Sequence, residues 1–389
     1  MRLLLHMGDS YVIDNPCTKR MRTFKEEFEK QGHEVLIMAP GLVNAKSEDG
    51  VIYCKTPPLK KKTGFYRLIN GIGFAVKSVE EAKKIGKIDV VLTTCPPPLI
   101  NVAGWYISRR KHAKLIYDVR DIWPDVAVEM GSFGKKSIYY KVFNFIKKFM
   151  VRHADMIIAV SDGKVEKLSA LENRKKVVCI PNGFYEQFLE NSINDNLFNK
   201  IKSYCGIKCI YVGNLGLAQG LMQLLEIAEK CKKNDLEASF VIYGTGAEEK
   251  QLKEYVYEKK LDNVHFEGRL PNKDMYTVLK AADFSFVPLV NANLRDSIPT
   301  KLYEALGVGC PVILAAEGDS VKVLNETGYG VAVSPYNSEE LWNGFLKLFY
   351  KEQDILEKKD YAMELIKDKY SLRVSARKLM KYIDGILGD

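Results

Sequence analysis

The sequence predicts an α/β protein made of two doubly wound, parallel-sheet domains, and three observations support this class. Short apolar runs alternate with amphipathic segments along the whole chain, as in a series of strand–helix units. The series pauses at the polar stretch 190–196 and then starts again. The 389 residues also exceed what one hydrophobic core usually spans. We therefore expect a first domain over residues 1–190 and a second domain over residues 191–370.

The first domain contains seven expected strands. Apolar runs of this length between helical patterns are typical of strands buried on both faces. The stretch 19–32 shows the amphipathic pattern of a helix between the first two strands. The seven runs are residues 2–7, 34–39, 51–55, 89–94, 114–120, 156–161 and 177–182.

The second domain contains six further runs of the same kind, and residues 371–389 end the chain with a helical pattern. Ligands of such sheets bind at the carboxyl ends of the strands, so the loops after the strands are the candidate site. The six runs are residues 209–214, 239–244, 264–268, 284–289, 311–315 and 330–334.

Positive charge is concentrated in the first half of the chain. Residues 1–190 carry 32 Lys and Arg against 21 Asp and Glu, a net charge of +11, whereas the remainder has a net charge of −2. Such an asymmetry indicates an anionic partner for the first domain. DNA, RNA, an anionic membrane and a phosphorylated substrate all fit the charge alone.

The most informative loop runs from Asp296 to Glu304. Pro299 and Thr300 predict the start of a helix, which would extend from Lys301 to Leu306. Free N–H groups at that end, with Lys301 beside them, can bind a phosphate or diphosphate. The alternative is a helix cap with a solvated glutamate. The Gly-rich turns at 213–220 and 244–246 are weaker signals, because such turns often serve packing and neither matches a P-loop or a GxGxxG fingerprint.

In this order, the loops resemble the retaining GT-B glycosyltransferases of family four, which move a sugar from a nucleotide sugar to an acceptor. The segment 296–304 reads D-x7-E where that family has E-x7-E. The resemblance covers nearly the full length, and it looks closest to a branch that builds bacterial surface polysaccharides and includes N-acetylfucosamine transferases. The matching segments are GHEVLIMAP (32–40), DVRDIWP (118–124), HADMIIAVSD (153–162), CIPNGFYEQF (179–188), YVGNLGLAQGL (211–221), YGTGAEEKQL (243–252), residues 263–289, PTKLYE (299–304) and GVGCPVILA (307–315).

The resemblance implies two Rossmann-like domains that face each other across a cleft, with residues 371–389 crossing back to the first domain. The first domain would bind the acceptor and the second the nucleotide sugar. The resemblance implies that Glu304 holds the ribose, that Asp296 binds hydroxyls of the transferred sugar, and that residues 297–301 follow the diphosphate. The donor-binding candidates are Asn214, Gln219, Tyr243, Gly244, Arg269, Leu270, Ser297, Thr300 and Glu304, and the catalytic candidates are Asp296, Arg120 and Lys301.

Several positions depart from the family pattern. Asn214 and Gln219 stand where many members have Arg and Lys on the diphosphate, so Lys301 is our candidate for the missing cation, with Arg295 as a second. Asn15 and Pro16 stand where many members have Gly-Gly, and a proline has no N–H to donate. Either Thr18 or Lys19 compensates, or this loop serves the acceptor, and Asp121 belongs to the same group of first-domain candidates.

Arg120 takes the place of a histidine that the family often has. It could stabilise the leaving phosphate or hold a phosphate of the acceptor. The alternative is a structural ion pair with Asp118, Asp121 or Asp125.

The implied mechanism retains the anomeric configuration and needs no metal and no other cofactor. Positive groups and a helix dipole would stabilise the departing nucleoside diphosphate. The resemblance to this branch implies uracil as its base, and hence a UDP-linked donor. The five histidines show no ligand-like spacing.

The implied partners are a nucleotide-sugar donor and a glycan or polyprenyl-diphosphate-linked acceptor. Residues 55–79 and 137–152 mix lysines with aromatic and aliphatic side chains, which is typical of surfaces that dock on anionic membranes. The alternative is an apolar face packed on the sheet. With scattered cysteines and no export-signal pattern, we expect a cytoplasmic protein at the inner face of the plasma membrane.

Three rival functions remain open. The first is a nucleotide-sugar 2-epimerase on the same fold, which would have no use for a membrane surface. The second is a non-catalytic scaffold of a polysaccharide assembly complex, which the neutral Asn214 and Gln219 would suit. The third is a nucleic-acid binder, but the sequence contains no recognised nucleic-acid module, so we expect no nucleic acid as partner.

Overall fold

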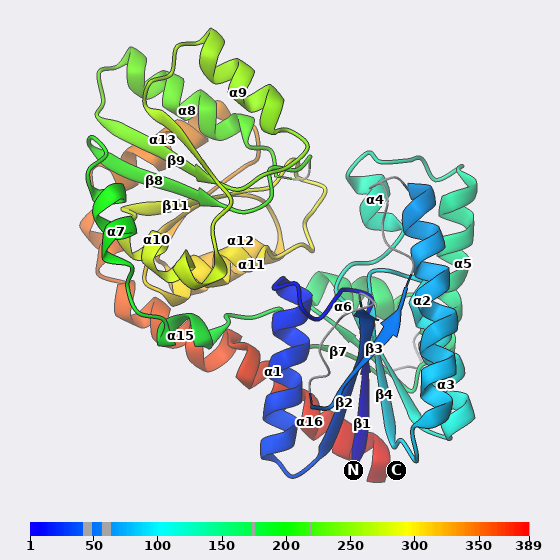
Figure 1. The fold of residues 1–389 in the computed structure, drawn as a ribbon. Coiled ribbons are helices and arrows are strands. Elements are labelled where there is room, and N and C mark those ends of the chain that lie inside the picture. The colour runs from blue at the N-terminus through cyan, green and yellow to red at the C-terminus, as the bar shows by residue number, and fades with distance from the viewer. Residues whose placement is uncertain (42–48, 57–63, 173–175, 218, 389) are drawn as a thin grey trace. The chain divides into compact units, whose positions relative to one another are not determined.

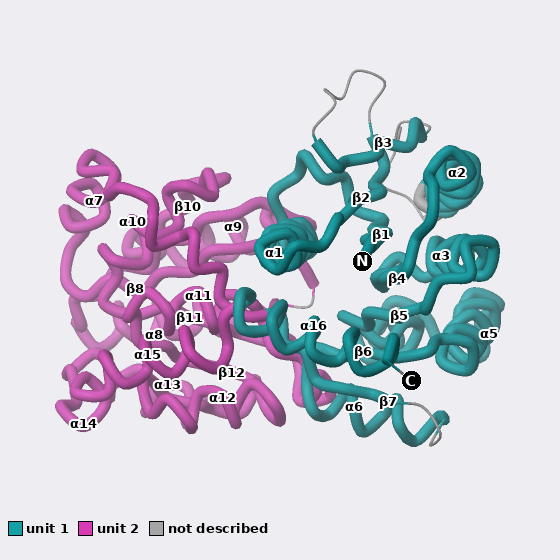
Figure 2. Tube along the Cα trace, turned by 90° about the horizontal axis from the view of Figure 1, so that it is seen from below, with its two compact units in different colours: residues 1–182, 372–389 teal, residues 183–371 magenta. Residues whose placement is uncertain are grey.

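The chain forms two compact units in the computed structural model, which describes residues 1–41, 49–56, 64–172, 176–217 and 219–388. Unit 1 comprises residues 1–182 and 372–389, and unit 2 comprises residues 183–371 (Figure 2). The division after residue 182 places residues 183–190, which the sequence assigned to the first domain, in the second unit. The C-terminal segment is part of unit 1.

Unit 1 contains, within its described residues, a sheet of seven parallel strands in the order β3-β2-β1-β4-β5-β6-β7. Helices connect the sequential strands except β2 and β3, between which the structure describes only residues 49 and 50. Each of the seven runs expected from the sequence overlaps one of these strands. The elements are β1 (Arg2–His6), α1 (Pro16–Lys30), β2 (Glu34–Gly41), β3 (Val51–Lys55), α2 (Gly64–Lys84), β4 (Val90–Cys95), α3 (Leu99–Lys111), β5 (Lys114–Val119), α4 (Asp125–Glu129), α5 (Ile138–His153), β6 (Met156–Ala159), α6 (Asp162–Ser169), β7 (Lys176–Cys179) and α16 (Leu372–Gly388).

Helices cover both faces of this sheet (Figure 1). Alternate residues of β1 point to opposite faces, so Leu3 and Leu5 pack with α1 and α16, whereas Leu4 packs in the second core with α2, α3 and α5. On the second face α3 packs between α2 and α5. This double coverage explains why the strands read as continuous apolar runs.

Unit 2 repeats the plan with six parallel strands among its described residues, in the order β10-β9-β8-β11-β12-β13. The six runs expected from the sequence each overlap one of them. The elements are η1 (Glu186–Glu190), α7 (Asp195–Lys202), β8 (Ile207–Val212), α8 (Met222–Lys233), β9 (Ala238–Tyr243), α9 (Glu249–Glu258), β10 (Val264–Gly268), η2 (Asn272–Asp274), α10 (Met275–Ala281), β11 (Phe284–Pro288), α11 (Thr300–Gly307), β12 (Val312–Ala315), α12 (Asp319–Thr327), β13 (Gly330–Val333), α13 (Ser338–Phe349), α14 (Gln353–Leu356) and α15 (Lys359–Tyr370).

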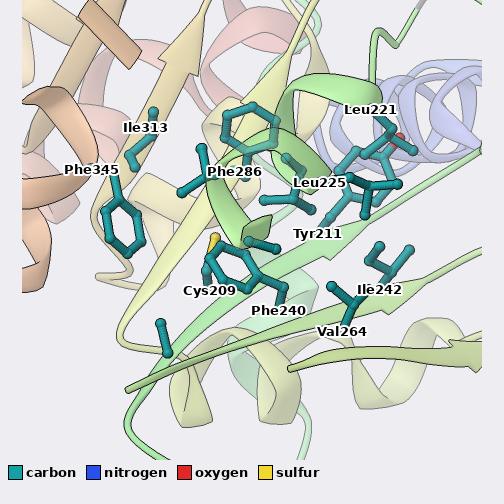
Figure 3. Close-up of a cluster of buried hydrophobic side chains, with 14 of the residues drawn as sticks. Cys209, Tyr211, Leu221, Leu225, Phe240, Ile242, Val264, Phe286, Ile313 and Phe345 are labelled. Atoms are coloured by element: carbon teal, nitrogen blue, oxygen red, sulfur yellow. The ribbon is translucent and has the colours of Figure 1, made fainter. Parts of the chain in front are cut away.

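The main core of unit 2 lies between the sheet and the helices α8, α9 and α13 (Figure 3). Phe240 and Phe284 from the strands meet Phe345 of α13, and all three are fully buried. Burying one such ring contributes about 1.5–3 kcal/mol. The core therefore fixes the strands, and with them the loops at their carboxyl ends.

Candidate functional site

The turns after β8, β9 and β10 are joined by backbone hydrogen bonds. The N–H of Gly213 donates to the carbonyl of Tyr243 (2.9 Å), and the N–H of Gly244 donates to the carbonyl of Gly268 (2.6 Å). Gly244 has a φ of 148°, and a Cβ at this position would lie 1.8 Å from the carbonyl oxygen of Gly213. These turns therefore form one continuous backbone surface at the carboxyl edge of the sheet, and it requires glycine at position 244.

The side chain of Tyr243 belongs to the core of unit 2 and not to this surface. It packs with Leu270 in a cluster on the second face of the sheet, and burial raises the pKa of its hydroxyl. No group in the described part of the chain forms a hydrogen bond with that hydroxyl. Arg269, between Gly268 and Leu270, is exposed. Tyr243 and Gly244 can therefore present only backbone groups at the turn, in keeping with the backbone contacts that the family resemblance implies.

Helix α11 starts at Thr300, and its N-cap residue is Pro299. Pro299 has no side-chain group with which to cap this end, and a helix N-terminus of this kind favours an anion. Ser297 lies just before the helix, and its carbonyl accepts a hydrogen bond from the Ser320 hydroxyl (3.1 Å). The side chains of Asp296 and Glu304 are both buried, 6% and 8% exposed. Glu304 is therefore not the solvated glutamate that the alternative interpretation of this loop requires.

Lys301 extends from α11 to the turn after β8. Its ammonium group donates to the side-chain oxygen of Gln219 and to the hydroxyl of Tyr211 (3.0 Å), and it lies 4.5 Å from the centroid of the Tyr211 ring. The Tyr211 hydroxyl in turn donates to the carbonyl of Asn214 (2.7 Å). The structure thus brings the predicted residues Asn214, Gln219 and Lys301 together.

Burial lowers the pKa of Lys301 from 10.5 to about 8, although the nearby Glu304 carboxylate acts in the opposite direction. A neutral amide and a phenol hold the ammonium, and within the described part of the chain no carboxylate accepts a hydrogen bond from it, so it lacks a direct counter-ion there. An anionic ligand at the start of α11 would supply one. Arg295, the second cation considered, instead forms an ion pair with Glu317.

In unit 1, the loop after β1 leads into a capped helix. The side-chain oxygen of Asn15 accepts hydrogen bonds from the N–H (3.0 Å) and the hydroxyl (3.3 Å) of Thr18, so Asn15 is the N-cap of α1 and Pro16 its first residue. Thr18 and Lys19 lie in the first turn and are buried. This capping explains an Asn-Pro pair at this position without a ligand.

Arg120 lies at the carboxyl end of β5, where its guanidinium is held on one side. Nε donates to the hydroxyl of Thr94 (3.0 Å), and Nη2 donates to the carbonyl of Pro96 (2.8 Å) and lies 3.4 Å from a carboxylate oxygen of Asp9. The alternative of a structural ion pair named Asp118, Asp121 or Asp125 as partner, but the ion pair of Arg120 is with Asp9, while Asp118 pairs with Arg20 (3.1 Å) and Asp125 with Lys147. Asp121 follows in the turn and is half-buried.

Sequence reasoning missed three residues of these sites. Tyr211 supports Lys301, Asp9 contacts Arg120, and the fully buried Arg20 pairs with Asp118 and donates to the carbonyls of Ile180 and Pro181. Asp9 and Tyr211 stand at the ends of strands, which is the signal that could have found them. No sequence feature marks Arg20 as a buried residue, because it lies among other basic residues of an amphipathic helix, where an arginine is usually exposed.

The two segments proposed to meet a membrane lie on one helical layer of unit 1. Residues 57–63 fall outside the described residues, but α2 and α5 flank α3 on the same face (Figure 1). Ile138 and Phe145 of α5 are 73% and 70% exposed, and Ile72 and Val76 of α2 are also exposed. The alternative, in which the apolar side chains of these segments pack on the sheet, is therefore wrong for these four residues. Other residues of α5, such as Ile146 and Met150, are buried and do pack toward the sheet.

No helix among the described residues is both long enough and apolar enough to span a bilayer. No group of three or more His, Cys, Asp or Glu side chains there is arranged to hold a metal ion.

Comparison with known proteins assigns each half of the chain to a glycosyltransferase family model. Residues 18–187 match Glycosyltransferase Family 4, and residues 195–365 match Glycosyl transferases group 1. The chain is 24% identical to the probable glycosyltransferase WbjE of Pseudomonas aeruginosa over 272 residues, which are 69% of this chain and 67% of that protein. It is 24% identical to the putative colanic acid biosynthesis glycosyl transferase WcaI of Escherichia coli over 374 residues, covering 88% and 91%.

Solved structures share the fold at low identity. The sucrose-phosphate synthase of Thermosynechococcus elongatus superposes with a TM-score of 0.82 at 15% identity, covering 100% of both chains. The HepE protein of Anabaena in complex with UDP-glucose superposes with a TM-score of 0.73 at 15% identity, covering 98% and 99%. With both family models matched in order and two parallel-sheet domains, the chain belongs to the GT-B glycosyltransferases.

Proposed function

We propose that this glycosyltransferase moves a sugar from a UDP-linked donor to a glycan or polyprenyl-diphosphate-linked glycan in bacterial surface polysaccharide assembly, with retention of configuration and without a metal. The observation that carries the proposal is the partly buried Lys301 ammonium, whose hydrogen bonds go to a neutral amide and a phenol and which links the start of α11 to the turn after β8. A diphosphate has the charge and the acceptor oxygens that this arrangement lacks.

Each donor residue then has a role in unit 2. Lys301, Ser297 and Thr300 bind the diphosphate, and Lys301 replaces the cations absent at Asn214 and Gln219. Glu304 accepts hydrogen bonds from the ribose and Asp296 from the transferred sugar. The turns at 243–244 and 269–270 hold the base through backbone groups.

The proposed transfer step needs no reactant other than the donor and the acceptor. The acceptor hydroxyl attacks the anomeric carbon from the face that the leaving group occupies, and the bond from that carbon to the β-phosphate oxygen breaks. The departing diphosphate takes the hydroxyl proton. Lys301 and the α11 N-terminus stabilise the charge on the leaving group, which is catalysis by electrostatic preorganisation.

The comparisons support the substrate class of this proposal. WcaI is described as acting in colanic acid biosynthesis, and HepE was crystallised with UDP-glucose. The resemblance to the N-acetylfucosamine-transferase branch makes UDP-linked N-acetylfucosamine a donor to assay early. The epimerase and scaffold alternatives have no observation in their favour.

The first domain is proposed to rest on the inner face of the plasma membrane through the layer of α2 and α5. Exposed apolar side chains on α5 stand among the exposed lysines Lys135, Lys136, Lys141 and Lys148. A basic helix with an exposed apolar stripe suits an anionic lipid surface, where each cation contributes about 1 kcal/mol.

Calorimetric titration with UDP and with GDP tests the donor site. We expect UDP to bind, Glu304→Ala to weaken it at least tenfold, and Glu258→Ala, at an exposed glutamate of α9, to leave it unchanged. Mass spectrometry of a UDP-sugar with and without acceptor then separates transfer from epimerisation. Failure of both nucleotides to bind would favour the scaffold reading and refute the proposal.

A further inference from the structure

The loop that leads from β11 into α11 passes along the start of α12. Strands β11 and β12 are parallel neighbours in the sheet of unit 2, so the loops after them leave the same carboxyl edge side by side. The first of these loops carries Asp296, and the second, residues 316–318, leads into α12. The carboxylate proposed to bind the sugar therefore lies on a loop that a second helix can hold.

Two hydrogen bonds join the start of α12 to the residues on either side of Asp296. The N–H of Asp319 donates to the carbonyl of Arg295 (2.7 Å). The Ser320 hydroxyl donates to the carbonyl of Ser297 (3.1 Å). Both donor residues are buried, which shields these bonds from water. The backbone of Asp296 is therefore fixed on both sides by one helix.

Gly318 lets the two loops approach more closely than a residue with a side chain would allow. Its φ is 76°, and a Cβ there would lie 2.0 Å from the carbonyl oxygen of Arg295. An ion pair between Glu317 and the Arg295 guanidinium adds a third connection, but it is largely exposed and contributes little. Residues 317–320 thus combine a close backbone approach with two hydrogen-bond donors, all directed at the loop of Asp296.

The main residues proposed for the nucleotide are held by another helix. Lys301 and Glu304 lie on α11, which packs against α15, where the Tyr303 ring lies 5.5 Å from that of Tyr370. Lys301 also reaches the turn after β8. A shift confined to the start of α12 would therefore move Asp296 and leave the ammonium and carboxylate of α11 in place.

We propose that residues 317–320 are positioning residues that set the selectivity for the transferred sugar, by fixing Asp296 relative to α11. The inference rests on the proposed function, in which Asp296 binds hydroxyls of that sugar. A carboxylate distinguishes two epimers only while its oxygens stay within about 0.5 Å of the position that one hydroxyl orientation requires. An aspartate has one rotatable bond fewer than the glutamate of the family pattern, so its carboxylate follows its backbone more closely.

Calorimetric titration with UDP and with two pairs of UDP-sugars tests this assignment. The pairs are UDP-glucose with UDP-galactose and UDP-N-acetylglucosamine with UDP-N-acetylgalactosamine, whose members differ only at one sugar hydroxyl. We expect the wild type to prefer one member of a pair about tenfold, as one hydrogen bond to a carboxylate provides. Gly318→Ala and Ser320→Ala should each lower this preference below threefold, while the affinity for UDP changes by less than threefold.

Two matched variants separate positioning from a general loss of structure. Ser239→Ala also removes a buried hydroxyl that donates to a carbonyl, that of Cys205, near the amino end of β9. Gly328→Ala adds a Cβ at the other end of α12, where φ is 63° and the nearest neighbour is the Lys358 side chain at 3.4 Å. Both variants should keep the preference of the wild type.

Three outcomes would count against the inference or its basis. If UDP affinity falls more than threefold in Ser320→Ala, residues 317–320 support the whole donor site and the inference is overturned. It is also overturned if the preference stays above threefold in either folded variant, Gly318→Ala or Ser320→Ala, or if the wild type distinguishes neither pair. A wild type that binds no UDP refutes the proposed function itself.

Discussion

Replacing Lys301 with methionine should stabilise unit 2 and weaken donor binding at the same time. Burial lowers the pKa of this lysine from 10.5 to about 8, which means that folding disfavours its charged form. Methionine has a similar length and carries no charge to desolvate. The gain in stability and the loss of affinity would have one cause, an ammonium group that burial disfavours and that a bound diphosphate would stabilise.

The size of the effect follows from the pKa. A shift of about 2.5 units at 1.36 kcal/mol per unit gives about 3 kcal/mol as the upper limit. The variant also loses hydrogen bonds to Tyr211 and Gln219, about 1 kcal/mol each, so the net gain at pH 7 is about 1 kcal/mol.

The pH dependence gives the sharper signature. Between pH 8 and 10.5 the unfolded wild type binds more protons at this lysine than the folded protein, so wild-type stability rises with pH through this window. The advantage of Lys301→Met is complete well below pH 8. Between pH 7 and pH 9.5 the stability difference should fall by about 2 kcal/mol, so the variant becomes about 1 kcal/mol less stable than its parent at pH 9.5.

Urea unfolding at both pH values measures this difference. Replacing Trp105 and Trp123 with phenylalanine leaves Trp342 as the single tryptophan of the chain, so its fluorescence reports on unit 2. Lys250→Met, at an 89% exposed position of α9, is the control and should change the stability by less than about 0.5 kcal/mol. A stability difference between Lys301→Met and its parent that is independent of pH would refute the reasoning. So would UDP binding that is unchanged by the substitution, for which we expect a loss of tenfold or more.

Three other predictions concern packing, the turn and the membrane face. Asp118→Ala should destabilise unit 1 by about 3–5 kcal/mol in chemical denaturation, because it leaves the fully buried Arg20 without its ion pair. The control Glu34→Ala, which breaks the exposed ion pair with Arg2, should destabilise it by less than about 1 kcal/mol, and equal losses in the two variants would contradict the reasoning. Gly244→Ala should abolish UDP binding, since its Cβ would overlap the Gly213 carbonyl, while Gly131→Ala, with a φ of 74° and no neighbour within 4 Å, should bind UDP normally. Phe145→Glu should reduce the fraction of protein that floats with anionic vesicles at least fivefold. Leu171→Glu, at another exposed apolar residue of unit 1, is the control and should float as the wild type does. Similar losses in both variants would argue against a docking role for α5.

The sequence by itself determined the two parallel sheets. All thirteen apolar runs became strands, because burial on both faces of a sheet demands continuous apolar residues and leaves this demand visible in the local pattern. The start of α11 was equally readable, since Pro299 and Thr300 act on their own neighbourhood.

Only the tertiary structure decided which charged groups meet. Lys301 contacts Gln219 and Tyr211, which are 82 and 90 positions away, and the carboxylate that contacts Arg120 is that of Asp9, 111 positions away. Likewise, the pattern of α5 allowed either a packed or an exposed aromatic face, and only the neighbouring α3 shows which residues remain exposed. Strand and helix patterns arise from each residue's own environment, whereas partners are chosen by the order in which strands join a sheet, and no single segment of the sequence records that order.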